Sequence, residues 1–174
     1  RTSCRHLEPF ENNMIAPLVI LSFDLECEND GTNRFPKAEL GDPIHCIGVR
    51  LHRMYSADPP RRLVFCYKKT VYSGDMEIEI VHAKNECDML DKFRDFVVQS
   101  QTDVITGYNI DGFDLPFLFK RAEMLQCARF NFMSKIIHAR VDNKETTQKS
   151  NQKGYAKKSN LRNLHGRFTV DMMS

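Results

Sequence analysis

The amino-acid sequence predicts an α/β fold, in which a meander of strands is followed by a helix, a strand and a second helix. Runs of β-branched and aromatic residues fill the first third of the chain, and two later segments repeat apolar residues at helical spacing. The 174 residues are 41% hydrophobic and 28% charged, with 8 glycines and 7 prolines. This composition excludes a collagen, a coiled coil and a disordered tail, and the length favours a single domain.

Three segments in the first half predict strands. Residues 16–27 (APLVILSFDLEC) are branched and aromatic and end at turn residues, which indicates a buried central strand. Residues 42–52 alternate apolar and polar side chains and predict a second strand. Residues 62–67 predict a third, after the turn that Pro59 and Pro60 introduce. Together they indicate an antiparallel meander.

The next segments alternate helices with a short strand. Residues 85–99 place apolar side chains at helical spacing and begin with Asn85, a favourable N-cap, so they predict an amphipathic helix. Residues 104–108 (VITGY) predict a short buried strand. Residues 114–126 predict a second helix, with Pro116 in its first turn.

The last part of the chain is polar and basic. Residues 141–163 predict a loop or a long hairpin, and residues 167–173 return as a strand. From Lys135 to Arg167 the chain carries nine basic and two acidic residues, whereas the rest carries 16 basic and 21 acidic ones. Such a segment is either a solvated loop or an element that follows the phosphates of a nucleic acid, and composition alone leaves both open.

The six cysteines stand about twenty or more residues apart. No Cys-x-x-Cys pair and no cysteine–histidine pair has the spacing of zinc ligands, so a zinc site is not expected. We therefore expect free thiols in a reducing compartment. No apolar stretch approaches the roughly 18 residues of a membrane span, so we expect no membrane as a partner.

Two carboxylates follow the apolar part of the first predicted strand. Side chains alternate along a strand, so Asp24 and Glu26 project from the same side. Two like charges beside an apolar strand are costly unless a cation joins them, and Mg²⁺ or Mn²⁺ is the natural ion for oxygen ligands. The alternative is that the pair simply ends the strand in water.

A second polar group surrounds the entry to the helix at 114–126. Asp114 lies near the N-terminus of this helix, where a carboxylate can act as a simple cap. Asn109 and Phe113, in the preceding turn, could offer an amide and a flat ring to a nucleotide. Taken alone, the same two residues could be a turn residue and a core ring.

Taken together, the two segments resemble a known family. The sequences at 21–27 (LSFDLEC), 103–122 (DVITGYNIDGFDLPFLFKRA) and 166–173 (GRFTVDMM) occur in the order found in the 3′–5′ proofreading exonuclease domain of family B DNA polymerases. The likeness is greatest to polymerase delta and to the polymerases of large DNA viruses. It implies an RNase H-like exonuclease fold, with a mixed central sheet flanked by helices, and it implies hydrolysis of the terminal phosphodiester with two ions, Mg²⁺ or Mn²⁺.

The resemblance also implies catalytic roles. Asp24 would bridge both metal ions, Glu26 would hold the ion that activates water, and Asp114 would hold the ion beside the leaving 3′ oxygen. Two ions about 4 Å apart can clamp the attacking and leaving oxygens of an in-line displacement, and negatively charged ligands are needed to recruit them.

The implied DNA contacts are spread over two regions. Asn109 and Phe113 match positions that grip the single-stranded 3′ end of the primer, and Leu25 would lie against the terminal nucleotide. Residues 146–164 match, in place and charge, a hairpin that helps to separate the primer from the template in such polymerases, so the template duplex is an expected partner as well. The candidate DNA contacts in this hairpin are Lys149, Lys153, Lys157 and Lys158.

The resemblance covers only part of such a polymerase. Residues 1–15 are expected to be the remnant of a preceding N-terminal domain, and residues 16–174 the exonuclease domain, truncated at its C-terminus. The third exonuclease motif, Tyr-x-x-x-Asp, is not found after Arg167, and Asp171 matches a strand residue rather than a ligand. We therefore expect weak or no activity from these residues alone.

Several alternatives and partners follow from the same reading. The parent protein is expected to be a DNA polymerase whose remaining domains are partners of this one, whereas its processivity partners are unknown. A stand-alone exonuclease and a catalytically silent DNA-binding module of the same fold are the alternatives. The expected location is intracellular: the nucleus for a cellular enzyme, and the nucleus or a cytoplasmic replication site for a viral one.

Overall fold

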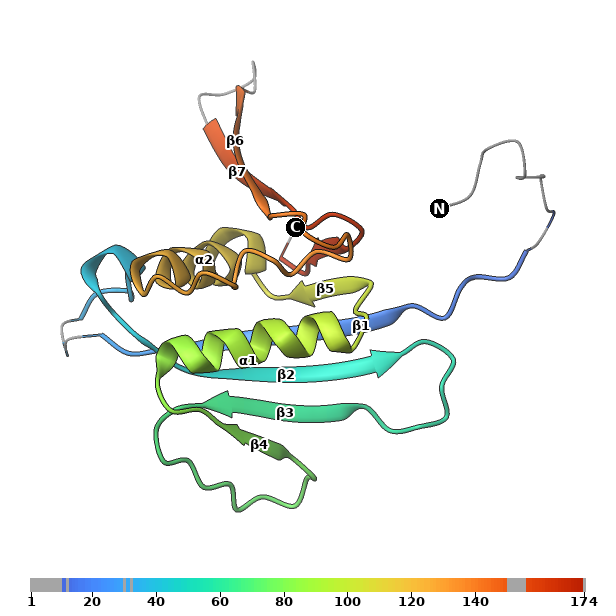
Figure 1. The fold of residues 1–174 in the computed structure, drawn as a ribbon, viewed down its shortest axis with the longest axis horizontal. Coiled ribbons are helices and arrows are strands. Elements are labelled where there is room, and N and C mark those ends of the chain that lie inside the picture. Colours follow the sequence, from blue (N-terminus) through green and yellow to red (C-terminus); the bar gives the residue numbers. More distant parts are fainter. Residues whose placement is uncertain (1–10, 12, 30, 32, 150–155, 174) are drawn as a thin grey trace.

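A six-stranded mixed sheet forms the centre of the computed structural model, which describes residues 11, 13–29, 31, 33–149 and 156–173. The order of the strands across the sheet is β4-β3-β2-β1-β5-β8 (Figure 1). Their bounds are β1 Val19–Cys27, β2 Ile44–Arg53, β3 Arg61–Cys66, β4 Glu79–His82, β5 Val104–Gly107 and β8 Phe168–Asp171.

The first three strands form the predicted antiparallel meander. Antiparallel pairs join β1 to β2 and β2 to β3. The other neighbours are parallel, since β5 pairs with β1, β8 with β5, and β4 with β3. The sheet is therefore mixed, as expected, and β4 is an edge strand that the sequence analysis did not predict.

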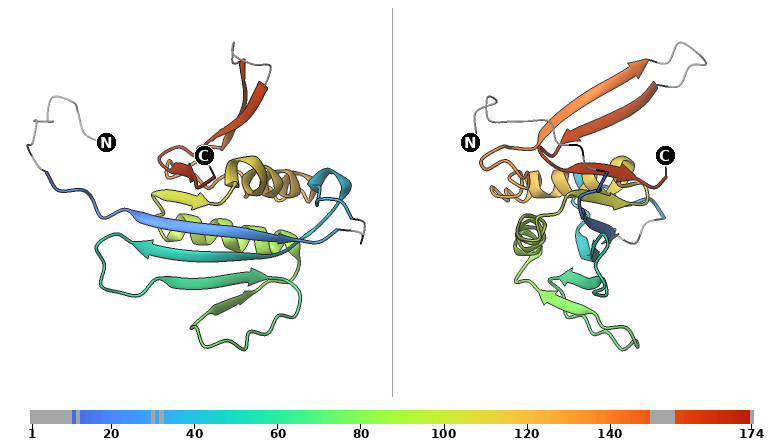
Figure 2. Two further views of the ribbon diagram at one scale, coloured as in Figure 1. Left: turned by 180° about the vertical axis from the view of Figure 1, so that it is seen from behind. Right: turned by 90° about the vertical axis from the view of Figure 1, so that its right-hand side faces the viewer.

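Helix α1 (Glu86–Gln99) lies along one face of the sheet, as the view from the side shows (Figure 2). Its predicted cap is confirmed, because the side chain of Asn85 accepts a hydrogen bond of 2.9 Å from the backbone N–H of Asp88. The buried side of α1 faces the sheet, and the rings of Phe93 and of Phe23 in β1 have centroids 5.5 Å apart. The odd-numbered residues of β1 are thus the core side of that strand.

Helix α2 (Leu115–Met124) follows β5 through a π-helical turn at Ile110–Asp114. A buried ion pair holds α2 to α1, because Arg121 donates to the carboxylate of Glu86 at 2.9 and 2.5 Å. Glu86 also accepts the backbone N–H of Ile44 at 2.9 Å. This carboxylate therefore joins both helices to β2.

The basic segment forms a hairpin, the second of its two predicted conformations. Strands β6 (Asp142–Lys149) and β7 (Ala156–Asn163) are antiparallel and make a separate two-stranded sheet. The hairpin projects away from the central sheet (Figures 1 and 2).

The expectation of free thiols is wrong for one pair. Cys87, in the first turn of α1, and Cys127, just after α2, form a disulfide with their Cα atoms 5.8 Å apart. The two cysteines are 40 residues apart in sequence, and the packing of the helices brings them together. Cys27, Cys46 and Cys66 are free thiols.

Neither helix in the described part of the chain has the length and apolarity to cross a lipid bilayer. The expected N-terminal remnant at 1–15 lies mostly outside the described residues.

Candidate active site

The candidate site lies at the edge of the sheet where β1 and β5 end. These two strands are parallel, with Ser22 opposite Thr106, so their carboxyl ends meet at one edge. β1 brings Asp24 and Glu26 to this edge, and the turn after β5 brings Asn109, Phe113 and Asp114. The structure thus brings together the two segments that the sequence analysis singled out.

Asp24 and Glu26 are both exposed, on the side of β1 opposite its buried residues. Their neighbours Phe23 and Leu25 are 4% and 7% exposed and belong to the core. The alternation predicted from the sequence is therefore present, and it places two carboxylates side by side at the end of an apolar strand.

Asp114 is almost fully buried, with 2% of its surface exposed. Its side chain makes no capping hydrogen bond to α2. Instead, Oδ1 accepts the backbone N–H of Leu25 at 3.2 Å, across 89 residues of sequence. The simple cap is therefore not its role, and this hydrogen bond fixes the second motif to the residue between Asp24 and Glu26.

The electrostatic field at this edge is negative. Burial and, to a lesser extent, the nearby Asp24 carboxylate raise the pKa of Asp114 to about 6, against the effect of the Leu25 N–H. Burial also raises the pKa of the Cys27 thiol to about 12, with added contributions from Asp114, Glu86, Glu26 and Asp24. Carboxylates therefore gather at the end of β1 without enough positive charge to balance them.

The three carboxylates fit a divalent metal ion by charge and donor type. Carboxylate oxygens are the ligands that Mg²⁺ and Mn²⁺ prefer, and none of the three forms an ion pair with another described residue. Within the described part of the chain, however, no group of three or more His, Cys, Asp or Glu residues has a geometry that could hold a metal ion. The site therefore has the negative charge that a cation needs, but its described residues do not form a complete set of metal ligands.

Asn109 occupies the left-handed region of the backbone, with φ 57° and ψ 28°. Asp171, at the end of β8, holds this turn: its carboxylate accepts the backbone N–H of Asn109 at 2.8 Å and that of Asp111 at 3.1 Å. The turn also needs Gly107, because a Cβ there would lie 2.4 Å from Ile110 Cγ2 and 2.6 Å from the Phe23 carbonyl oxygen. These contacts set the position from which Asn109 and Asp114 approach β1.

Phe113 is half-buried and lies beside the exposed ring of Phe35. The centroids of Phe113 and Phe35 are 5.4 Å apart with the rings edge to face, and Phe117 continues the row at 5.3 Å. Phe35 is 74% exposed. It comes from the loop between β1 and β2, which Asp42 braces by accepting from Arg34 and from the backbone N–H of Lys37.

The remaining predicted contacts are placed only in part. The Leu25 side chain packs into the core, so its contact with a terminal nucleotide stays a prediction. The backbones of Lys149, Lys157 and Lys158 lie in the hairpin, opposite Ala156, Gln148 and Thr147, and their side chains lie outside the described residues. Lys153 lies wholly outside them.

The sequence analysis assigned no role in the site to two residues of this edge, Asp171 and Phe35. Asp171 reads as an ordinary strand residue, and only the parallel pairing of β5 with β8 reveals that it holds the Asn109 turn. Phe35 is an exposed aromatic residue in a loop, which is a weak signal, because single exposed apolar residues are common.

The chain is similar to proteins of known family. The model of "DNA polymerase family B, exonuclease domain" matches residues 2–174. The DNA polymerase delta catalytic subunit of Oryza sativa subsp. japonica is 32% identical over 97% of this chain, and that of Drosophila melanogaster is 34% identical over 94%. A solved family B DNA polymerase from the archaeon Pyrobaculum calidifontis matches 94% of the chain with a TM-score of 0.57 and 25% identity.

These matches confirm the resemblance and the exonuclease fold expected from it. The chain spans only 15% and 14% of the length of the two polymerase delta subunits, and 16% of the archaeal polymerase.

Proposed function

Because the chain belongs to the family of exonuclease domains of family B DNA polymerases, we propose that it hydrolyses the terminal nucleotide at the 3′ end of a DNA primer. In this proposal it is the proofreading 3′–5′ exonuclease of a DNA-directed DNA polymerase. The remaining polymerase domains of that protein would pass a mismatched primer end to it.

One observation carries this proposal. The hydrogen bond from the Leu25 N–H to Asp114 places the second carboxylate motif directly against the first, in the middle of the Asp24–Leu25–Glu26 segment. Two of the carboxylates are exposed to a substrate and the third is buried behind them. An arrangement of uncompensated carboxylates at the end of a strand suits metal-assisted phosphodiester hydrolysis.

Exonuclease domains of this family depend on divalent metal ions, and in this chain Asp24, Glu26 and Asp114 would hold them. When bound, two Mg²⁺ or Mn²⁺ ions would neutralise the phosphate and lower the barrier to attack by water. Without cations, the exposed Asp24 and Glu26 would repel a phosphodiester, so the same carboxylates that recruit metal also make DNA cleavage depend on it.

The chain's own residues would position the DNA. The half-buried ring of Phe113, beside the exposed ring of Phe35, would stack against an unpaired base, and stacking tolerates any sequence. Asn109 would hold the same nucleotide through its amide, from a turn that Asp171 keeps in place. Recognition by stacking favours a frayed end, because a paired base is not free to stack on a protein ring.

The test is removal of a mismatched 3′ nucleotide from a primer in Mg²⁺, with the longest form of the protein that contains these residues. Asp24→Asn should lower the cleavage rate about 10²–10³-fold or more, since it removes a charge that stabilises the transition state. Asp58→Asn is the matched control, because Asp58 is an exposed carboxylate in the turn between β2 and β3, beyond the opposite end of β1.

Binding of single-stranded DNA should survive in both variants. If the parent protein and Asp24→Asn are equally inactive and both bind DNA, the domain is a silent binding module and the proposed role of Asp24 is wrong.

A further inference from the structure

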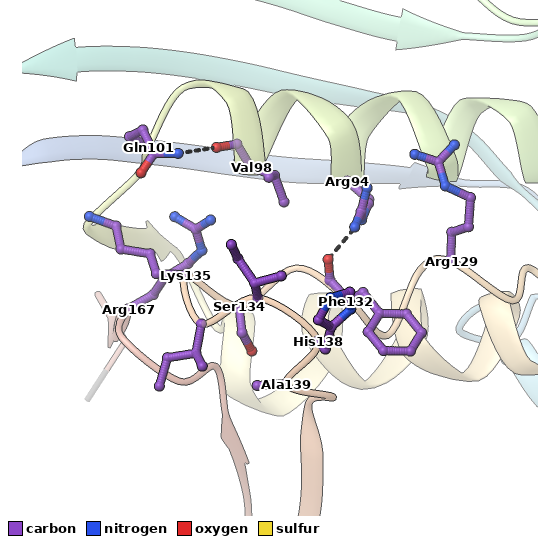
Figure 3. A pocket seen from close by; sticks show the side chains of 12 residues that line it. Arg94, Val98, Gln101, Arg129, Phe132, Ser134, Lys135, His138, Ala139 and Arg167 are labelled. Carbon is purple, nitrogen blue, oxygen red and sulfur yellow. Dashed lines mark hydrogen bonds between the residues drawn. The ribbon is translucent and has the colours of Figure 1, made fainter. Parts of the chain in front are cut away.

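A cavity of about 500 Å³ opens at the other end of β5, away from the carboxylates (Figure 3). It lies between the last turns of α1, the segment at 129–139 and the residue that precedes β8. Arg167 ties it to the start of β5, because its Nη1 donates to the carbonyl oxygen of Thr102. This cavity shares no residue with the candidate active site.

Positive charge dominates the wall of this cavity. Four of its side chains are cationic, namely Arg94, Arg129, Lys135 and Arg167, and no carboxylate lines it. Two carboxylates lie behind the wall: Asp95 pairs with Arg94 and Arg129, and Asp103 pairs with Lys135. Since four cations face only two anions, the cavity keeps an excess of positive charge and would attract an anion.

Two buried donors on the wall have no partner within the described part of the chain. Arg167 is only 8% exposed; its Nε donates to the Met133 carbonyl oxygen at 2.7 Å, but its Nη2 has no acceptor. The hydroxyl of Ser134, 7% exposed, also lacks a partner. Burial lowers the pKa of Arg167 to about 10, against the opposing effect of the Asp103 carboxylate. Unsatisfied buried donors are costly, so these two groups point to an acceptor that enters the cavity.

Apolar side chains also line the cavity. They are Val98, Phe132, Ile136 and Ile137, and Ile137 is 81% exposed. A ligand that satisfies both kinds of side chain carries an anionic group for the cations and an apolar or planar group for these residues. The volume lies in the range of small-molecule sites, about 300–1,000 Å³.

Lys135 and Arg167 are the first and last basic residues of the segment from 135 to 167, and the fold brings both ends of this segment together at the cavity. The Lys135 N–H donates to the His165 carbonyl oxygen at 2.9 Å. Gly166 permits the close approach, because a Cβ there would lie 2.9 Å from the Cβ of Lys135. Backbone contacts therefore hold Lys135 and Arg167 beside the cavity in the absence of a ligand.

We propose that this cavity binds the phosphate of a nucleotide, with the sugar or base against its apolar side chains. The source of that phosphate is either a free 5′-mononucleotide or a unit of a DNA strand, and the chemistry of recognition is the same for both. This inference goes beyond the proposed exonuclease function, since it concerns a second site at the opposite end of β5.

The test is isothermal titration of the protein with deoxythymidine 5′-monophosphate, thymidine and inorganic phosphate. All titrations contain EDTA and use the Asp24→Asn background, so that metal-dependent binding at the carboxylates contributes nothing. The monophosphate should bind and thymidine should not. Ser134→Ala and Lys135→Gln should each weaken binding about tenfold, the size expected for one hydrogen bond to a charged group.

Lys120→Gln is the matched control, because Lys120 also pairs with a single carboxylate, that of Glu123, but lies on α2 and does not line the cavity. It should leave the affinity unchanged. Thermal unfolding separates a binding role of Ser134 from a structural one: removing an unsatisfied buried hydroxyl should not lower Tm, even though it weakens binding.

A short thymidine oligonucleotide without terminal phosphates distinguishes the two sources. Tighter binding of the oligonucleotide assigns the site to a DNA strand, and tighter binding of the monophosphate assigns it to a free nucleotide. If no phosphate compound binds, or if binding is the same in Ser134→Ala, Lys135→Gln and Lys120→Gln, the inference is overturned. None of these binding measurements depends on exonuclease activity, so their failure would not count against the proposed function.

Discussion

Replacing Glu86 by glutamine should destabilise the domain strongly, although the two side chains have nearly the same shape. The Glu86 carboxylate accepts two hydrogen bonds from Arg121 and one from the Ile44 N–H. The side chains of Arg121 and Glu86 are only 7% and 9% exposed. Hydrogen bonding to this carboxylate raises the pKa of Arg121, so the guanidinium depends on it for its charge balance.

The size of this loss of stability depends on which of the Glu86 interactions a glutamine can still make. Its carbonyl oxygen can still accept from Ile44, so the backbone hydrogen bond to β2 is kept. The Arg121 cation, however, stays buried without its paired carboxylate, which costs about 3–5 kcal/mol. For a domain of this size, about 2–4 °C of Tm is lost per kcal/mol, so Tm should fall by about 6–20 °C.

Thermal and urea unfolding of Glu86→Gln would measure this loss, with Glu79→Gln as the control. Glu79 also pairs with an arginine, at 2.8 Å, but the side chains of Arg61 and Glu79 are 58% and 56% exposed. An exposed pair contributes only about 0–1 kcal/mol, so the control should unfold almost like the parent protein. Equal, small losses of stability in the two variants would mean that burial does not make the Glu86–Arg121 ion pair important.

Three further substitutions test residues that hold the loops of the candidate site in place. Arg34 and a backbone N–H lower the pKa of Asp42 from 3.8 to about 2. The ionised Asp42 therefore stabilises the fold fully above pH 3.8, and this stabilisation is lost as the pH falls through about 2. Asp42→Asn should be less stable than the parent protein at neutral pH and should lose less stability on acid titration. Gly107→Ala should cost about 1–3 kcal/mol in urea unfolding, because its Cβ would press on the Phe23 carbonyl oxygen. Asp171→Ala should slow 3′-end cleavage more than it weakens metal binding, and equal effects on both would argue against a positioning role.

The framework of the fold could be predicted from local sequence. The apolar run that ends at Cys27 predicts β1, and Asn85 predicts the start of α1, because both signals depend on neighbouring residues only. The strand at Glu79–His82 escaped prediction, since four residues at the edge of a sheet are too few to show alternation.

The composition of the candidate site was predictable, but its geometry was not. Local spacing puts Asp24 and Glu26 on one side of a strand, and the structure agrees. Nothing local predicts that Asp114 accepts the Leu25 N–H instead of capping α2, because that hydrogen bond spans 89 residues. Only the resemblance to a family linked the two motifs before the fold was known.

Long-range partners account for the remaining differences. The Cys87–Cys127 disulfide depends on how α1 packs against α2, which the spacing of the cysteines does not reveal. Likewise, the basic segment gave no sign that Lys135 and Arg167 would line one cavity, because the β6–β7 hairpin lies between them in sequence.

A Mn²⁺ titration followed by electron paramagnetic resonance measures whether Asp24, Glu26 and Asp114 act together as a site for divalent ions. The protein should bind Mn²⁺, and Asp24→Asn and Asp114→Asn should each lower the affinity about tenfold or more, while Asp58→Asn should not. Unchanged Mn²⁺ binding in both site variants would mean that these carboxylates do not form a metal site.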